Sequence, residues 1–531
     1  MNFLKKQFRR RALSMKRLAR NEQAALILIF AILFGAWFRL MPAWLAEFPV
    51  NDGGMFYSMI VDLQANHYAP PLFTTYNHLS IPFAYPPLGF YLGAFLSDLL
   101  RVSPIEILRW LPGVMNALTI PAFYFFAQTV WKDSFQSAVA ALIFAFIPHL
   151  TSWNSMGGGL TRSLGMFFML LTLAYAYRIF ESTADVAARK DIFGAILFGS
   201  LTALSHTEAP IYAAAIALFI WAAKSRSLKG LLRGAGVALG VLLVGGAWYG
   251  LSIYRHGVAP FLSIAQTGAH SVFSIFKVLN VSFLTEEPYL GLLGALGVLG
   301  FAALLMKREF FIPLMFCVIY LAQPRSAHMI GNIPLALAAG YFAAEILLPA
   351  LTRLDKRQGA FFALLAAYAF SNSMLYGINQ SQKILAESER MAMRWARENT
   401  PPQSAFLVIS GDTDAFCDPV TEWFPALSLR QSATTVQGRE WLLNDKFGEF
   451  MFQSRSVQAC IDEGLACLQR EARALGEPFE YIYLSISAAT KSCGLSEDSR
   501  LTTRALLIEL EDSAEFEEIY RSEDAAIFEK R

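Results

Sequence analysis

The sequence predicts an α-helical polytopic membrane protein with a C-terminal extracytoplasmic α/β domain. Of its 531 residues 55% are hydrophobic, more than the roughly 45–50% usual in soluble domains, and the mean hydropathy is +0.41. The charges are divided unevenly: residues 1–379 carry 28 Lys/Arg and 16 Asp/Glu, whereas residues 380–531 carry 16 and 26. The first part is therefore net +12 and the second net −10, which indicates two environments separated near residue 380.

Long apolar runs define the expected transmembrane domain, residues 23–379. The first run, residues 23–43, is long enough to span roughly 30 Å of hydrocarbon. It follows a basic tail, residues 1–22, with no clear cleavage site, so we expect an uncleaved signal anchor with a cytoplasmic N-terminus. Ten further runs bring the expected number of transmembrane helices to about eleven. They are residues 105–130, 135–151, 160–180, 191–205, 208–223, 233–253, 289–306, 309–322, 328–350 and 359–378.

The run at residues 85–100 either spans the membrane or lies in its interface. The positive-inside rule favours an interfacial helix, because counting this run as a span would put most of the loop Lys/Arg on the outer side. Residues 44–104 then form a first outer loop with interfacial helices, and no Lys/Arg occurs between Met41 and Leu100. In a bacterial inner membrane, this topology also places the tail 380–531 outside the cytoplasm.

The tail begins with a polar helical pattern that Pro401 and Pro402 end. Strand-like runs follow at residues 405–410, 481–486 and 504–510, with a terminal pair after them, and together they predict a small α/β domain. Four of the chain's cysteines lie here, and they allow three disulfide pairings between which the sequence does not choose. They are Cys417, Cys460, Cys467 and Cys493.

Asp52 stands where the chain leaves the first span, in the segment Asn51-Asp52-Gly53-Gly54. A carboxylate near membrane depth costs a few kcal/mol, and the two glycines let backbone or ligand approach closely. Two interpretations are open. Asp52 is either the N-cap of the helix that follows or a functional carboxylate.

The turn before the fourth span holds three consecutive glycines, Gly157 to Gly159, followed by Arg162. Free N–H groups at a helix start and a guanidinium group both suit an anion such as phosphate. The alternative is a flexible reversal with one interfacial arginine.

His206 and Glu208 separate two short apolar runs in which a plain helix pair would not need them. They can line a cavity, either as metal ligands or as a base and the group that orients it. Alternatively, Glu208 caps the helix that begins at Ala209.

Arg325 and His328 lie at the expected outer end of a span pair, where the positive-inside rule does not explain an arginine. A phosphate-binding role for Arg325 is favoured, with a salt bridge to Asp52 or Glu208 as the alternative. A polar segment of the tail contains an Asp-x-Asp spacing, which suggests a cation or sugar contact but is common in loops. It includes Asp412, Asp414, Asp418, Glu422, Trp423, Arg430 and Trp441.

Together these features resemble the GT-C superfamily of membrane glycosyltransferases, which move a sugar from a polyprenyl-phosphate carrier at the outer membrane face. The resemblance rests on the acidic motif at 51–54, the Tyr-Pro-Pro-Leu element at 85–88 and the order of spans and exported domain. The chain is also similar to a poorly characterised bacterial branch that shares the Trp-Phe-Pro segment at 423–425 and the Gln-Gly-Arg-Glu-Trp segment at 437–441.

The resemblance implies that Asp52 is a catalytic base or metal ligand. Family members often have a second acidic residue before the fourth span, where this chain has Asn154 and glycines, so the second catalytic or metal-binding role is expected at His206 and Glu208. A divalent cation, Mg or Mn, is an option and not a requirement, because arginines can also neutralise phosphate. The residues expected to bind substrate are Arg162, Arg325, His328, Tyr85, Asn154 and Trp423.

The expected reaction transfers a sugar from a polyprenyl-phosphate-linked donor to a glycan, lipid or protein acceptor on the extracytoplasmic face, with inversion. A base must deprotonate the acceptor and positive charge must stabilise the departing phosphate. Membrane lipid is an expected partner and nucleic acid is not. The competing interpretation is a polytopic transporter or lipid flippase with an exported partner-binding domain, although the unusual residues gather at one face instead of near the midplane. A sensor or scaffold is a third class, and it needs none of these polar residues.

Overall fold

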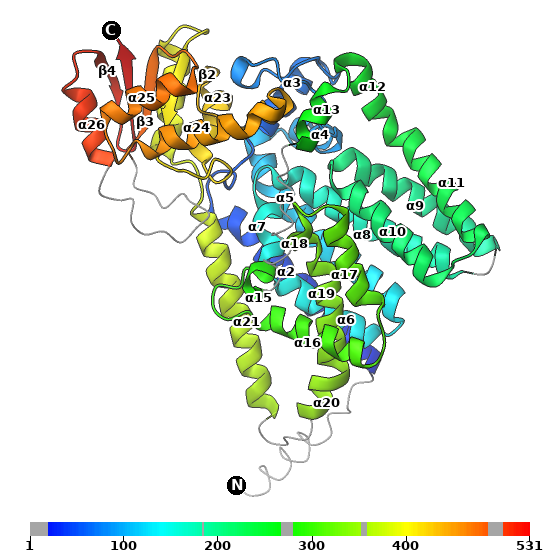
Figure 1. Cartoon of the computed structure of the whole chain (residues 1–531). Coiled ribbons are helices and arrows are strands. Elements are labelled where there is room, and N and C mark those ends of the chain that lie inside the picture. The colour runs from blue at the N-terminus through cyan, green and yellow to red at the C-terminus, as the bar shows by residue number, and fades with distance from the viewer. Residues whose placement is uncertain (1–19, 183–184, 267–279, 352–357, 487–502) are drawn as a thin grey trace, which may run out of the picture.

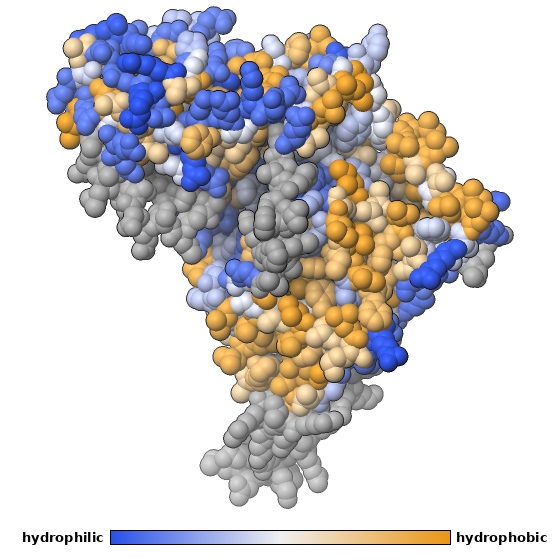
Figure 2. Space-filling model, in the orientation of Figure 1, coloured by the Kyte–Doolittle hydropathy of each residue, from blue (hydrophilic) through white to orange (hydrophobic). Residues whose placement is uncertain are grey.

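The computed structural model describes residues 20–182, 185–266, 280–351, 358–486 and 503–531. Residues 1–19 of the expected basic tail lie outside the described residues. A bundle of helices leads into a smaller mixed domain that holds the C-terminus (Figure 1). On the face seen in Figure 2 the helical part is mainly hydrophobic and the smaller domain mainly hydrophilic. The prediction of a mostly helical chain with apolar helices and a small sheet is therefore confirmed.

The helical part covers residues 20–381. Its helices are α2 (Arg20–Leu45), α3 (Gly54–Ala65), η1 (Tyr76–His78), α4 (Leu88–Leu100), α5 (Pro104–Trp131), α6 (Ser134–Phe146), α7 (His149–Ser155), α8 (Gly159–Glu181), α9 (Asp185–Ser205), α10 (Ala209–Lys224), α11 (Leu228–Val244), α12 (Gly246–His256), α13 (Ala259–Gln266), α15 (Val281–Thr285), α16 (Leu292–Met306), α17 (Phe311–Ala322), α18 (Ala327–Ile330), α19 (Asn332–Phe342), η2 (Ala343–Leu347), α20 (Leu348–Leu351) and α21 (Gln358–Ser381).

Four helical segments in the described part of the chain are long and apolar enough to cross a membrane, and up to six if each of two bent pairs is one span. The bent pairs are α6 with α7, at 59°, and α11 with α12, at 47°. Four further apolar helices are shorter: α4, α10, α16 and α17. The number of eleven spans therefore stays a prediction, and so does their orientation. Helix α4 covers most of the run expected in the interface, with 13 residues.

Arg39 lies inside α2 with none of its surface exposed. Its Nη1 donates to the Asn116 carbonyl at 2.7 Å and to the Thr119 hydroxyl at 2.5 Å, and its Nη2 donates to the Phe144 carbonyl at 2.9 Å. Neutral acceptors on α5 and α6 therefore satisfy much of the hydrogen-bonding capacity of this buried cation. The backbone carbonyl of Arg39 accepts from Ser155, so α2, α5, α6 and α7 meet at this residue.

We expect Arg39→Met to lower the free energy of unfolding by about 2–4 kcal/mol, because it leaves buried acceptors on α5 and α6 without a donor. Thermal unfolding of the purified protein in lipid nanodiscs measures the change. Arg101→Met is the matched control: Arg101 is exposed at the end of α4, so a change below about 0.5 kcal/mol is expected there. Equal unfolding curves for Arg39→Met and wild type would contradict the assignment.

The C-terminal domain, residues 382–531, is built on one five-stranded sheet of order β2-β1-β3-β5-β4. Strand β1 pairs in parallel with β2 and β3, whereas β5 is antiparallel to both β3 and β4. Its elements are α22 (Glu387–Asn399), β1 (Ala405–Ile409), α23 (Pro419–Ser428), β2 (Gln431–Ser432), η4 (Arg439–Trp441), η5 (Asn444–Lys446), α24 (Phe447–Ala459), α25 (Leu465–Leu475), β3 (Tyr481–Ser485), α26 (Thr503–Glu511), β4 (Phe516–Arg521) and β5 (Ala525–Lys530).

The two faces of this sheet belong to different hydrophobic cores. Alternate residues of β1 point to opposite sides: Phe406 and Val408 join one core, and Leu407 and Ile409 the other. The second core contains residues of α24, α25 and α26. The first contains residues of α22 and α23 and continues into α3 and α4 of the helical part. The sheet is thus joined to the first loop by a shared core, and this fixes the C-terminal domain over that loop.

Two predictions for the tail need correction or completion. Residues 504–510, expected as a strand, belong to helix α26. The apolar run was ambiguous because a short continuous run suits a buried helix as well as a strand. Strand β2 was not predicted, since it has only two residues.

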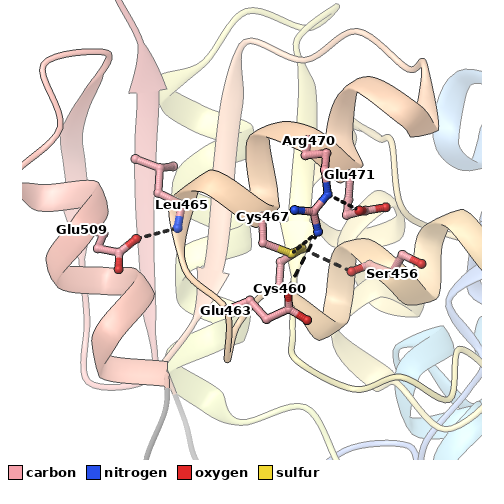
Figure 3. Close-up of a disulfide and its surroundings, with 8 residues drawn as sticks. All are labelled: Ser456, Cys460, Glu463, Leu465, Cys467, Arg470, Glu471 and Glu509. Atoms are coloured by element: carbon pink, nitrogen blue, oxygen red, sulfur yellow. Dashed lines mark hydrogen bonds and ion pairs between the residues drawn. A yellow bond between two sulfur atoms is a disulfide. The ribbon is translucent and has the colours of Figure 1, made fainter.

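One disulfide joins Cys460 to Cys467 between α24 and α25 (Figure 3). Cys417 is disulfide-bonded too, and Cys493 lies outside the described residues. Disulfides persist in oxidising compartments, which agrees with the expected location of the tail outside the cytoplasm.

Candidate functional site

A cavity of about 410 Å³ lies where the helical part meets the C-terminal domain. Its walls come from the loop before α3, the first turn of α8, the turn between α9 and α10, the segment around α18, and the residues before α23 and around η4. Eight of the nine sequence-predicted site residues line it, and Trp423 is the exception. The eight are Asp52, Tyr85, Asn154, Arg162, His206, Glu208, Arg325 and His328.

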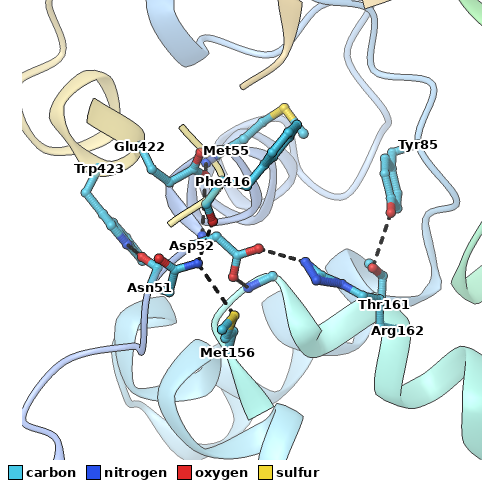
Figure 4. A network of polar contacts seen from close by, with 12 residues as sticks. Asn51, Asp52, Met55, Tyr85, Met156, Thr161, Arg162, Phe416, Glu422 and Trp423 are labelled. Carbon is cyan, nitrogen blue, oxygen red and sulfur yellow. Dashed lines mark hydrogen bonds and ion pairs between the residues drawn. The ribbon is translucent and has the colours of Figure 1, made fainter. Parts of the chain in front are cut away.

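Asp52 is held at the start of helix α8 (Figure 4). Its Oδ1 accepts from the Gly158 amide at 2.8 Å, and its Oδ2 lies 2.7 Å from Nη2 of Arg162. Gly158 is the N-cap of α8, so the carboxylate lies at the positive end of a helix dipole. Helix α3 begins at Gly54 with Gly53 as N-cap and has no side-chain capping bond. The N-cap interpretation of Asp52 is therefore wrong.

Glycine is required where this loop meets the turn before α8. A Cβ added at Gly158 would lie 2.4 Å from Oδ2 of Asp52, and one added at Gly157 would lie 2.1 Å from the Asp52 carbonyl oxygen. The consecutive glycines therefore let the carboxylate reach the helix N-terminus. The sequence predicted an anion here, and in this structure the anion is the protein's own Asp52.

Arg162 lies in the first turns of α8 and is mostly buried. One of its nitrogens contacts Asp52, and the guanidinium lies 5.2 Å from the centre of the Trp153 ring. Guanidinium has five N–H donors, so the ion pair with Asp52 leaves others that can face the cavity. The turn before α8 therefore carries an ion pair between Asp52 and Arg162 at the helix N-terminus. The alternative interpretation, a flexible reversal with one interfacial arginine, is wrong.

His206 lies in the turn between α9 and α10, beside Glu208. The Glu208 amide donates to Nδ1 of His206 at 3.3 Å, so a neutral imidazole carries its proton on Nε2. Burial lowers the pKa of His206 to about 4. A neutral imidazole with an occupied Nδ1 is a hydrogen-bond donor at pH 7. This geometry favours His206 as a hydrogen-bond donor, and its expected role as a general base stays a prediction.

Glu208 connects the turn to the segment before α18. Its Oε2 accepts from the Ser326 hydroxyl at 2.5 Å, and its Oε1 lies 3.9 Å from Nε of Arg325. Glu208 occupies the N-cap position of α10 but makes no side-chain capping bond, so its interpretation as a capping residue is wrong. The structure contains the salt bridge between Arg325 and Glu208 that the sequence offered as the alternative to phosphate binding.

The His206 shift implies an acid-sensitive contribution to stability. Since the folded-state pKa of about 4 lies below the roughly 6.5 of an unfolded chain, the contribution is complete above pH 6.5 and is lost as pH falls from 6.5 to 4. Between pH 7 and pH 4 we expect the free energy of unfolding of His206→Asn to fall by about 3 kcal/mol less than that of wild type. Melting curves across that range measure this difference. The control His67→Asn, at an exposed position, should lose as much stability as wild type over this pH range. If wild type and His206→Asn lost stability equally as the pH falls, His206 would not be the source of the acid sensitivity.

Three further predicted residues line the cavity with their own partners. Asn154 donates to the Leu150 carbonyl at 3.2 Å. The Tyr85 ring lies edge-on to His206, with ring centres 6.4 Å apart, and 6.1 Å from Trp441. His328 lies edge-on to His149 at 4.9 Å. Tyr85 and Trp441 therefore give the cavity an aromatic wall.

Trp423 was expected to bind substrate, and its position does not agree with that. The ring is fully buried, 4.6 Å from Phe48, and its Nε1 donates to the Asn51 carbonyl at 2.9 Å. It lies outside the cavity lining. Trp423 instead anchors the C-terminal domain to the loop that carries Asp52.

Glu422 and Glu440 line the cavity from the C-terminal domain. Glu422 was noted only as part of the acidic tail segment and Glu440 not at all, and neither was among the predicted catalytic, substrate-binding or metal-binding residues. Burial, followed by the negative charge of Asp52, raises the pKa of Glu422 to about 8. Burial raises the pKa of Glu440 to about 7. The signal was present, since both residues lie in or beside the segments at 423–425 and 437–441 that carried the family resemblance.

The residues here do not form a metal-ligand set of the usual kind. No group of three or more His, Cys, Asp or Glu side chains in the described ranges is placed to hold a metal ion. Asp52, the first expected ligand, already faces a guanidinium and an amide, while Glu208 faces Ser326 and Arg325. The expected Mg or Mn site does not fit these contacts, and no step below involves a metal.

Solved structures share this architecture at low sequence identity. ArnT from Cupriavidus metallidurans bound to undecaprenyl phosphate matches with a TM-score of 0.56 and 12% identity, covering 95% of this chain and 97% of ArnT. The apo state of ArnT matches with a TM-score of 0.55 and 13% identity, again covering 95% of this chain and 97% of ArnT. Arabinofuranosyltransferase AftD from Mycobacteria matches with a TM-score of 0.52 and 13% identity, covering 94% of this chain and 40% of AftD.

No protein-family model matches the chain, and no curated protein matches it in sequence. The matched structures nevertheless cover nearly all of it. The chain therefore shares its overall fold with ArnT and AftD, which agrees with the fold that the sequence resemblance implied.

Proposed function

We propose that this protein is a glycosyltransferase that moves a sugar from a polyprenyl-phosphate-linked donor to an acceptor at the extracytoplasmic face of a bacterial inner membrane. The observation that carries the proposal is the pairing of Asp52 with Arg162, 2.7 Å apart in a cavity between apolar helices and a polar domain. A base for the acceptor and a cation for the phosphate are the two groups this transfer requires. The ArnT structure bound to undecaprenyl phosphate supports a lipid phosphate as the leaving group.

The reaction follows from these two groups. The acceptor hydroxyl gives its proton to Asp52 while its oxygen attacks the anomeric carbon of the sugar. The bond between that carbon and the phosphate oxygen breaks, and the phosphate leaves with the bonding electrons. Guanidinium groups of Arg162 and Arg325 offset the developing negative charge. A single displacement inverts the anomeric configuration.

The remaining cavity residues orient the substrates. Neutral His206 offers its Nε2 proton as a hydrogen-bond donor, and Glu208 positions Arg325 through their ion pair. Tyr85 and Trp441 provide aromatic surface, which suits the apolar face of a sugar ring. A volume of about 410 Å³ falls in the range of small-ligand sites. The acceptor class, a glycan, a lipid or a protein, stays a prediction.

The test uses the full chain in lipid nanodiscs with a panel of undecaprenyl-phosphate sugars. We expect release of undecaprenyl phosphate from one donor, faster when a hydroxyl-bearing acceptor is supplied. Movement of intact donor between leaflets of a vesicle without release would favour the flippase alternative. If no donor is either cleaved or moved between leaflets, the result contradicts both the glycosyltransferase proposal and the flippase alternative.

A further inference from the structure

The C-terminal domain holds the loop that carries Asp52 through several hydrogen bonds. The amides of Gly53 and Met55 both donate to Oε1 of Glu422, each at 3.3 Å. On one side of them the Trp423 indole donates to the Asn51 carbonyl. The Asn51 amide group donates to the Phe416 carbonyl at 2.8 Å. Helix α23 and the residues before it thus bind the loop on both sides of Asp52 (Figure 4).

The contact between this loop and α23 is close. A Cβ added at Gly54 would lie 2.3 Å from the Glu422 carbonyl oxygen, so only glycine fits there. That carbonyl also accepts from the Tyr76 hydroxyl at 2.6 Å. Glu422 itself is 6% exposed. Its side chain therefore has little freedom, and a shift of Glu422 would move the backbone next to Asp52.

The charges around Glu422 favour its neutral form. Asp52 on the facing loop and Glu440 on η4 are both acidic, Asp418 lies one turn earlier at the start of α23, and Tyr76 faces it from η1. No salt bridge to Glu422 occurs in the part of the chain that the structure describes. Burial and the negative charge of Asp52 raise the pKa of Glu422 to about 8, so Glu422 is mostly protonated at pH 7.

We propose that Glu422 is the positioning residue for Asp52, and that it acts as a neutral carboxylic acid. This inference rests on the proposed function. Neutral Glu422 accepts from Gly53 and Met55 and fixes the loop without adding a charge beside Asp52. Once Glu422 ionises, a second negative charge lies close to the base and opposes the departing phosphate, so transfer slows in alkaline solution. The C-terminal domain is in this way a part of the catalytic site.

Two variants separate positioning from charge. Glu422→Gln keeps an oxygen acceptor for the two amides and cannot ionise, whereas Glu422→Ala removes the acceptor. We expect Glu422→Ala to lower kcat by about 100-fold, as small misplacements of a catalytic group do. Glu422→Gln should recover at least tenfold of that loss and should lose the fall in kcat near pH 8. Glu449→Gln, exposed on α24, is the matched control and should keep the wild-type pH profile.

A second measurement does not depend on activity. Hydrogen exchange of the Gly53 and Met55 amides should be at least tenfold faster in Glu422→Ala than in wild type, and near wild type in Glu422→Gln. Unchanged exchange in Glu422→Ala would overturn the positioning role, and an unchanged alkaline fall in Glu422→Gln would overturn the role of the neutral acid. If wild type releases no polyprenyl phosphate, the proposed function fails, while amide exchange still decides whether Glu422 holds the loop.

Discussion

Asp52→Asn is expected to lower the release of polyprenyl phosphate by about 10³-fold, within the 10²–10⁴ that general base catalysis supplies. The amide oxygen can still accept from Gly158, so the loop geometry is kept. The amide cannot take a proton from the acceptor, and the charge that faces Arg162 is gone. Single-turnover release from a saturating donor in nanodiscs isolates this step from substrate binding.

The control for this variant is Asp98→Asn on helix α4. Asp98 is exposed, accepts from Gln64 and lies outside the cavity lining, so full activity is expected. A melting temperature close to wild type shows that Asp52→Asn is folded. Activity within threefold of wild type would remove Asp52 from the chemistry.

Arg162→Met has the second largest expected effect, a loss of 10²–10³-fold in kcat, which is the usual magnitude for one group that stabilises developing negative charge. The substitution also leaves Asp52, only 16% exposed, without its cation. Arg162→Lys keeps the charge but not the forked geometry, and it should recover about tenfold of the loss. Release assays with each variant measure both effects.

Arg101→Lys and Arg101→Met are the controls for this pair, because Arg101 is exposed and lies outside the cavity lining. Both should behave like wild type. If Arg162→Met raises KM and leaves kcat unchanged, Arg162 binds the donor equally in ground and transition states. Stabilisation of the leaving phosphate would then fall to Arg325.

Much of the helical architecture could be predicted from the sequence, because an apolar run of about 20 residues in a membrane has few alternatives to a helix. Placing those runs also placed the turns between them. Residues at 52, 162, 206 and 325, far apart in sequence, were expected at one face of the membrane, and in the structure they line one cavity. That part of the site required only the order of the spans.

What the sequence did not provide is the docking of the C-terminal domain. Nothing in a local pattern tells that Glu422 meets Gly53 or that Trp423 reaches Asn51, because these contacts depend on tertiary packing between distant segments. For the same reason Trp423 was assigned to substrate, since an exposed tryptophan and a buried anchor look alike in one sequence. The short parallel strand β2 also lacked a local signal.

The hydrogen bond between Gly53 and Glu422 joins residues 369 positions apart, and this separation has a consequence for the timing of synthesis. Translation proceeds at roughly 5–20 residues per second, so roughly 20–75 seconds pass between the two residues leaving the ribosome's catalytic centre. During that interval the loop with Asp52 exists without the helix that holds it. A nascent or truncated chain that ends before residue 422 therefore lacks an assembled site, and the protein becomes competent only after residue 422 of 531 has been made.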